Sequence, residues 1–111
     1  MRIVQKPWGY EQIWAETDKY LGKILYVKQG HRLSRQYHNV KHETIMVLSG
    51  TLRLELGAAG ENVIMMVPES SYEILPGTIH RFCAASDDVS ILEVSTPEID
   101  DVIRLSDDYI R

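Results

Sequence analysis

The sequence lacks the features that mark secreted or membrane-spanning proteins. Cys83 is the single cysteine among 111 residues, which excludes an internal disulfide and favours a reducing compartment. No apolar run approaches the ~20 residues that span a bilayer, and the N-terminus lacks the apolar segment of a secretory signal. We therefore expect a cytoplasmic protein.

An excess of positive charge is also lacking. The net charge is -4 and the pI is about 5.5. Nucleic acids and anionic membranes both attract clustered basic side chains, so we expect neither as a partner. The hydrophobic fraction of 44% and the charged fraction of 25% are ordinary for a globular protein. The length fits a single domain over residues 1–111.

No long segment shows the 3.6-residue period of a helix. Short runs rich in β-formers recur instead, separated by turn residues at spacings of roughly 8–12 residues. This pattern predicts an all-β barrel or sandwich of about eight to ten strands. The expected strands are 10–14, 20–28, 44–48, 51–56, 63–67, 72–75, 80–84, 89–95 and 98–105.

The clearest strand pattern lies at 51–56. Its strict alternation places three leucines on one face and Arg53 and Glu55 on the other. A two-residue turn that ends at Gly50 separates it from the strand at 44–48. A turn of this length between two strands predicts a β-hairpin.

Polar side chains that can bind metals cluster between Gly30 and Gly50. Five fall within eight residues: Gln36, His38, Lys41, His42 and Glu43. Because successive side chains of a strand alternate between faces, a shared parity indicates a shared face. Parity predicts that one set of these side chains faces inward and that His42 faces outward. The inward set is Gln36, His38, Glu43 and, from a later strand, His80.

Two imidazoles, one carboxylate and one amide oxygen suit Zn²⁺, Mn²⁺ or Fe²⁺. With a single carboxylate the complex stays positive, so the metal keeps its Lewis acidity. One alternative is that these are surface residues whose histidines are satisfied by hydrogen bonds. Another is a helical pair of His38 and His42 with Glu43, which the β-branched run after Glu43 disfavours.

Two segments resemble the two conserved motifs of cupins. The first is the spacing of Gly30, Gln36-Tyr37-His38, Glu43 and Gly50, and the second is the segment 76–80, Pro-Gly-Thr-Ile-His. The chain is most similar to the cupin module of mannose-6-phosphate isomerases, including the C-terminal part of bifunctional isomerase/guanylyltransferase enzymes. Segments that carry this resemblance cover almost the whole chain: 6–9, 33–38, 76–80, 92–95 and 100–105.

The resemblance implies a double-stranded β-helix, or jelly-roll, barrel. It implies one divalent ion held by Gln36, His38, Glu43 and His80; we expect zinc, with manganese, iron or nickel as alternatives. It suggests a sugar or sugar phosphate as the ligand and carbohydrate metabolism as the setting. By analogy with small cupins, we also expect a homodimer that pairs through the N-terminal arm around Trp8 and Tyr10.

An aldose–ketose isomerase must polarise a carbonyl and move a proton between C1 and C2. A bound metal supplies the first, and the candidates for the second are Lys41 and Glu93. A neighbouring cation is expected to lower the pKa of Lys41. The alternative for Lys41 is a solvated side chain without a catalytic role. The alternative for Glu93 is a buried carboxylate paired with an arginine.

Phosphate recognition would need cationic and hydroxyl groups. The sequence offers Lys28, Ser34, Arg35 and Arg81, although parity places Arg81 outward. Three functions remain open: a metal-dependent sugar isomerase or epimerase, a cupin-type metal-dependent oxygenase, and a non-enzymatic sugar- or metal-binding module.

Overall fold

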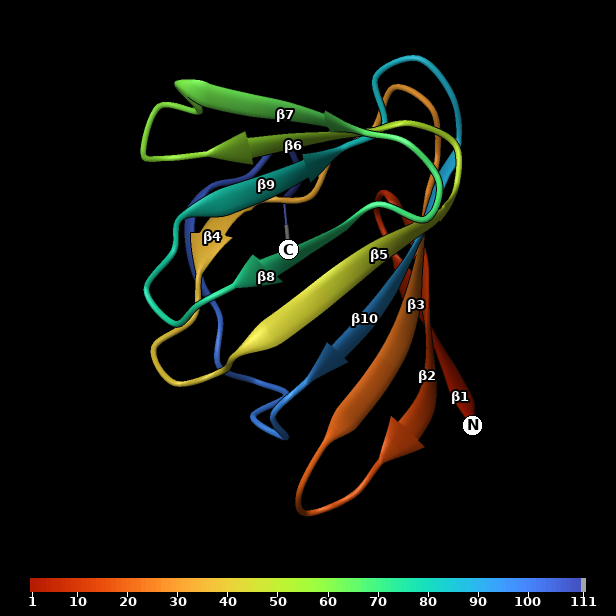
Figure 1. Ribbon diagram of the computed structural model, residues 1–111, viewed down its shortest axis with the longest axis vertical. Helices are drawn as coiled ribbons and strands as arrows, with labels where there is room; N and C mark the ends of the chain where they lie inside the picture. Colours follow the sequence, from red (N-terminus) through yellow and green to blue (C-terminus); the bar gives the residue numbers. More distant parts are fainter. Residues whose placement is uncertain (111) are drawn as a thin grey trace.

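The computed structural model describes residues 1–110, which form two antiparallel sheets packed face to face (Figure 1). The six-stranded sheet has the order β1 (Arg2–Lys6), β2 (Gly9–Glu16), β3 (Leu21–Val27), β10 (Val89–Ser95), β5 (Glu43–Ser49) and β8 (Ser71–Ile74). The five-stranded sheet has the order β11 (Ile103–Ser106), β4 (Arg35–Tyr37), β9 (His80–Cys83), β6 (Leu52–Leu56) and β7 (Asn62–Met66). This architecture confirms the predicted all-β fold.

The core lies between the two sheets and follows the predicted alternation. Ile45 and Val47 of β5, Leu52 and Leu54 of β6, and Ile91 of β10 are all 0% exposed. They meet across the sandwich, because each strand turns alternate residues toward the opposite sheet. Within the described residues, the structure has no helix long and apolar enough to cross a membrane.

The predicted hairpin over 44–56 is wrong. Strand β5 pairs with β10 and β8 in one sheet, whereas β6 pairs with β7 and β9 in the other. The two-residue link crosses from one sheet to the other at Gly50, whose φ of 76° lies in the left-handed region. Because the chain crosses between the sheets here, the apolar faces of β5 and β6 face each other across the core. In a hairpin the two strands would lie side by side in one sheet.

Three other expectations need correction. The sequence signals gave no strand for β1 or β4, and the last strand begins at Ile103 rather than at residue 98. Trp8 is 2% exposed and packs in the protein's own core. It is therefore closed to a partner chain, whereas Tyr10, the other aromatic residue of the expected dimerisation arm, is partly accessible.

Gly50 provides a test of the sheet crossing. A Cβ at this position would lie 2.1 Å from the backbone carbonyl oxygen of Asp88. Gly30 has a similar φ of 82° but no atom within 4 Å of the same point. We expect Gly50→Ala to lower the free energy of unfolding by about 2 kcal/mol or more beyond the effect of Gly30→Ala, which adds only backbone strain. Urea denaturation of both variants measures this, and equal losses would contradict the crossing geometry.

Candidate metal centre and ligand cavity

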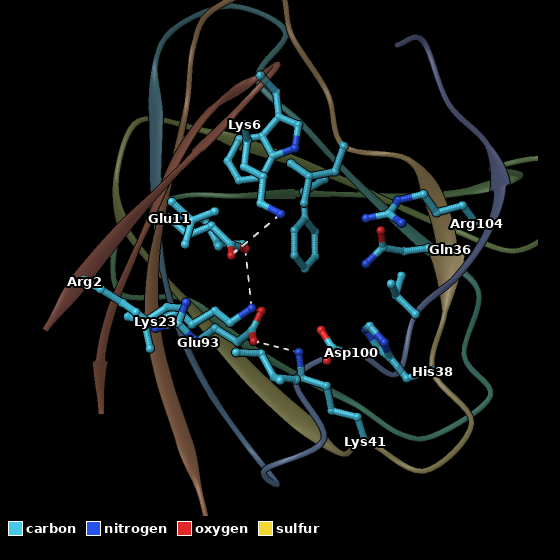
Figure 2. Close-up of a pocket in the computed structure, with 18 residues that line it drawn as sticks. Arg2, Lys6, Glu11, Lys23, Gln36, His38, Lys41, Glu93, Asp100 and Arg104 are labelled. Atoms are coloured by element: carbon cyan, nitrogen blue, oxygen red, sulfur yellow. Dashed lines mark hydrogen bonds and ion pairs between the residues drawn. The ribbon is translucent and has the colours of Figure 1, made fainter. Parts of the chain in front are cut away.

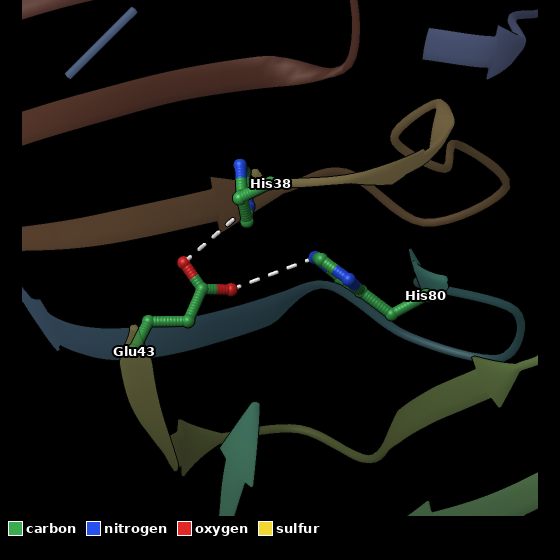
Figure 3. A group of neighbouring side chains, drawn as sticks. All are labelled: His38, Glu43 and His80. Atoms are coloured by element: carbon green, nitrogen blue, oxygen red, sulfur yellow. Dashed lines mark ion pairs between the residues drawn. The ribbon is translucent and has the colours of Figure 1, made fainter. Parts of the chain in front are cut away.

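His38, Glu43 and His80 come from both sheets and meet at one end of the sandwich (Figure 3). Glu43 opens β5, His80 opens β9, and His38 follows β4 by one residue. Glu43 Oε2 lies 3.7 Å from His38 Nε2, and Glu43 Oε1 lies 3.5 Å from His80 Nε2. Their candidate ligand atoms all lie within 4.8 Å of one another, and the three side chains are buried.

Hydrogen bonds fix which nitrogen of each imidazole faces the group. His38 Nδ1 contacts the carbonyl oxygen of Asp101, and His80 Nδ1 lies 2.9 Å from that of Thr78. A carbonyl only accepts, so each Nδ1 donates and each Nε2 keeps a free lone pair. Among the described residues, both Nε2 atoms and Glu43 Oε2 are buried without a hydrogen-bond partner, although Glu43 Oε2 lies 3.2 Å from the ammonium of Lys41. Buried imidazole lone pairs without donors are costly, so these residues fit a bound cation.

The electrostatics of the group also favour a cation. Burial lowers the pKa of His80 to about 4 and lowers that of His38, so both imidazoles are neutral at pH 7. Burial, with the repulsion of Glu93, raises the pKa of Glu43 to about 8. A cation bound by the group would favour the carboxylate form of Glu43.

The group borders a cavity of about 530 Å³ between the two sheets (Figure 2). His38 lines this cavity together with Gln36. Gln36 lies directly opposite His80 in the register of β4 and β9, so both side chains leave the same face of the sheet. Gln36 Oε1 accepts a 2.6 Å hydrogen bond from Ser34 Oγ, which holds the amide in place. All four predicted ligands therefore lie at this end of the sandwich.

Lys41 and Glu93 face the same cavity and contact each other. Lys41 Nζ donates to Glu93 Oε2 at 2.9 Å and lies 3.2 Å from Glu43 Oε2. Burial lowers the pKa of Lys41, but the attraction of Glu93 and Glu43 outweighs it and the pKa is raised. This direction is opposite to the one expected beside a cation. Burial raises the pKa of Glu93, yet Lys41 and Lys23 hold it below its usual value.

Two residues near the site lie away from the cavity, and for His42 parity predicted this. His42 is on the outer side, where its Nε2 lies 2.8 Å from Glu73 Oε2 in an exposed ion pair. Cys83 is buried on the opposite face of β9 from His80, and burial raises the pKa of its thiol to about 11. A protonated buried thiol has no nucleophilic role here.

The groups suggested for phosphate recognition do not line the cavity. Arg35 pairs with Glu55 at 2.9 Å, and Ser34 is bound to Gln36. Arg81, expected at the surface, is only 3% exposed. Its Nε donates to the Leu33 carbonyl at 2.7 Å and its Nη2 to Asp108 at 3.3 Å. The C-terminal segment thus covers the outer face of β9, which strand parity cannot reveal.

Six charged side chains that line the cavity were missed at the level of sequence: Arg2, Lys6, Glu11, Lys23, Asp100 and Arg104. Lys23 and Glu11 lie on the inner faces of β3 and β2, with Lys23 Nζ 3.4 Å from Glu11 Oε2. The available signal was a lysine that shares the parity of Leu21 and Leu25 in an otherwise apolar strand.

Asp101 also has a structural role. Its carboxylate accepts hydrogen bonds from the backbone N–H groups of Asn39, Val40 and Lys41, and its carbonyl orients His38. It therefore fixes the loop that joins His38 to Lys41.

Comparison with known proteins gives a family and a set of relatives. Residues 1–107 match the family described as Mannose-6-phosphate isomerase C-terminal. A mannose-1-phosphate guanylyltransferase of Escherichia coli K12 is 34% identical over 117 aligned residues, covering 99% of this chain and 23% of the relative. The xanthan biosynthesis protein XanB of Xanthomonas campestris is 30% identical, with 99% of this chain and 24% of the relative covered. The chain thus spans about a quarter of the length of these relatives.

Solved structures with the same fold are more distant in sequence. KdgF from Halomonas sp. has a TM-score of 0.77 at 16% identity, covering 87% of this chain and 88% of that one. A cupin-superfamily sugar phosphate isomerase from Silicibacter pomeroyi has a TM-score of 0.69 at 20% identity, covering 78% and 58%. These likenesses establish the double-stranded β-helix fold of the cupins. Together with the match over residues 1–107, they show that this chain belongs to the Mannose-6-phosphate isomerase C-terminal family of cupin domains.

Proposed function

We propose that the protein is a metal-dependent sugar phosphate isomerase that interconverts an aldose and a ketose, such as mannose 6-phosphate and fructose 6-phosphate. The observation that carries this is the group of buried lone pairs on His38, Glu43 and His80 at one end of a polar cavity. The proposed metal is zinc, with Gln36 as the fourth ligand, because the set is dominated by imidazole and oxygen donors. A divalent ion bound there would act as a Lewis acid on the sugar carbonyl.

In this proposal, Glu93 and Lys41 carry out the proton transfer. Of the three carboxylates that line the cavity, Glu11, Glu93 and Asp100, Glu93 is the one in contact with Lys41, whose Nζ also lies 3.2 Å from the proposed ligand Glu43. In the proposed reaction Glu93 removes the proton from C2 of the aldose and delivers it to C1, while a proton passes from O2 to O1. Substrate and product therefore contain the same atoms. Lys41 donates a hydrogen bond to Glu93, and in the proposed reaction it would donate another to the reacting oxygens.

A second function is supported by the length of the chain. Because it spans about a quarter of the relatives it matches, the domain would serve as a sugar- and metal-binding module if further segments were needed for turnover. Ligand binding without turnover would identify this case. The cytoplasmic location stays a prediction, in keeping with the single cysteine.

Metal binding can be tested by stability. Adding Zn²⁺ at about 100 times its Kd should stabilise the apoprotein by about 2.7 kcal/mol, and a chelator should reverse this. Glu43→Gln should abolish the effect because it removes the ligand charge. His42→Gln, on the outer side, is the matched control and should retain it. Thermal unfolding with metal analysis measures both variants, and stabilisation that survives in Glu43→Gln would argue against this centre.

The catalytic role of Glu93 can be tested by Glu93→Gln. The variant keeps the shape and loses the base, so kcat for mannose 6-phosphate should fall by about 100-fold or more while metal content is unchanged. A coupled assay of fructose 6-phosphate formation measures the rate. Glu73→Gln, an exposed change outside the cavity, should retain wild-type kcat. If Glu93→Gln matches the wild type, Glu93 is not the base.

We also propose that the homodimer forms through the outer face of the six-stranded sheet. The outward positions of β1, β2, β3, β10 and β5 alternate with the buried ones and include no charged side chain. Trp14, Leu48 and Val94 are 44%, 41% and 46% exposed on this face. Leu92 lies opposite Ile24 and Met46 in the register, so the apolar surface is continuous across three strands.

The size of this outer face suits a second copy of the chain. Five strands about 4.8 Å apart make it roughly 24 Å wide, and six residues at 3.4 Å make it about 20 Å long. Side chains that protrude from the sheet make the accessible area of the face larger than the product of this width and length. The accessible area therefore approaches the ~800 Å² per partner of a standard interface. Two identical uncharged faces bring no like charges together, so they can pack about a two-fold axis.

Val94→Glu tests this interface. A charge buried within it should raise the dimer Kd by roughly 100-fold or more, since an unpaired buried charge costs several kcal/mol. Val63→Glu, at a 40% exposed position of β7 in the other sheet, is the matched control. Sedimentation equilibrium measures both. A wild-type monomer at high concentration, or a Val94→Glu dimer as tight as the control, would contradict the proposal.

A further inference from the structure

Lys6 and Arg104 point toward one another from opposite walls of the cavity (Figure 2). We infer that they form a subsite for the phosphate group of the ligand, about two strands from the metal centre. The inference rests on the proposed function in taking a metal-bound sugar as the rest of that ligand. Lys6 ends β1 of the six-stranded sheet, and Arg104 lies in β11 of the other.

Arg104 has the position and the free charge that such a subsite needs. Within residues 1–110, its guanidinium makes no ion pair, although every other arginine there makes one. It lies opposite Gln36 in the register, and Gln36 lies opposite His80. The row His80, Gln36 and Arg104 crosses three adjacent strands, which separates its ends by about 10 Å. That distance is comparable to the length of a six-carbon sugar with a terminal phosphate.

Lys6 supplies a second, weakly neutralised charge. Its Nζ lies 3.9 Å from Glu11 Oε1, and the same carboxylate pairs more closely with Lys23 at 3.4 Å. One carboxylate therefore serves two ammonium groups. Arg2 also borders the cavity, but its guanidinium is bound to Glu16 at 3.1 Å and 3.2 Å, so it is already neutralised.

The charges without a close carboxylate indicate an anion. Of the five cationic side chains that line the cavity, Arg2, Lys23 and Lys41 have carboxylate partners within 3.4 Å, whereas Lys6 lies 3.9 Å from Glu11 and Arg104 makes no ion pair among the described residues. Two like charges that face each other repel unless an anion lies between them. A phosphate monoester has the oxygens for a bidentate contact with Arg104 and a point-charge contact with Lys6.

The test compares a phosphorylated ligand with its unphosphorylated parent. In the metal-loaded protein, Arg104→Gln and Lys6→Gln should each raise the Kd for mannose 6-phosphate by about 10-fold or more, since a charge-assisted hydrogen bond is lost. The Kd for mannose and the metal content should be unchanged. Arg53→Gln, an outward position on β6, is the matched control and should bind like the wild type. Isothermal titration calorimetry measures the three variants, with inorganic phosphate as a second probe.

The outcomes separate this inference from the proposed function. Loss of phosphate binding in Arg104→Gln and Lys6→Gln, in a protein that turns over no sugar phosphate, upholds the subsite and rejects the isomerase. Turnover of mannose 6-phosphate with an unchanged KM in both variants upholds the isomerase and overturns the subsite. A wild-type protein that binds neither mannose 6-phosphate nor inorganic phosphate also overturns the subsite.

Discussion

The burial of Glu43 between two imidazoles and an ammonium is the constraint on which the rest of the site depends. A carboxylate that is 2% exposed is stable only if its surroundings return the solvation it has lost. Lys41 Nζ, 3.2 Å from Glu43 Oε2, supplies part of the lost solvation. The lone pairs on the two imidazole Nε2 atoms supply none. The Nδ1 contacts to Asp101 and Thr78 fix the imidazoles in this orientation. The fold therefore holds three Lewis bases together, an arrangement in which a cation is the natural partner.

The same requirement extends along the inner face of the six-stranded sheet. Lys41, Glu93, Lys23, Glu11 and Lys6 alternate in charge across neighbouring strands, so each buried charge has a neighbour of opposite sign. An apolar core would be more stable, because paired buried charges seldom outweigh their desolvation. Their presence marks this wall as a polar ligand surface. Lys6, at the end of this row of alternating charges, is only partly neutralised by Glu11. A negatively charged ligand can complete the neutralisation.

The family match and the geometry support different parts of the functional proposal. The relatives are longer proteins whose names give guanylyltransferase and xanthan biosynthesis, and this chain covers only about a quarter of them. Those names belong to the longer proteins and assign no reaction to this domain. The geometry brings Lys41 and Glu93 beside a His/Glu/His group that could hold a metal, and these are the parts that the proposed reaction uses.

The sequence by itself determined the set of candidate metal ligands, because strand parity is a local property. Gln36, His38, Glu43 and His80 could be placed together, and His42 excluded, from alternation and the cupin-like spacing. The tertiary structure decided whatever depends on which segments become neighbours. Gly50 sends the chain to the other sheet instead of closing a hairpin, since the core is formed by faces that meet across the sandwich. The C-terminal segment buries Arg81, and strands β1 and β11 bring Lys6 and Arg104, 98 residues apart in the chain, to the wall of one cavity, a placement that no local pattern encodes.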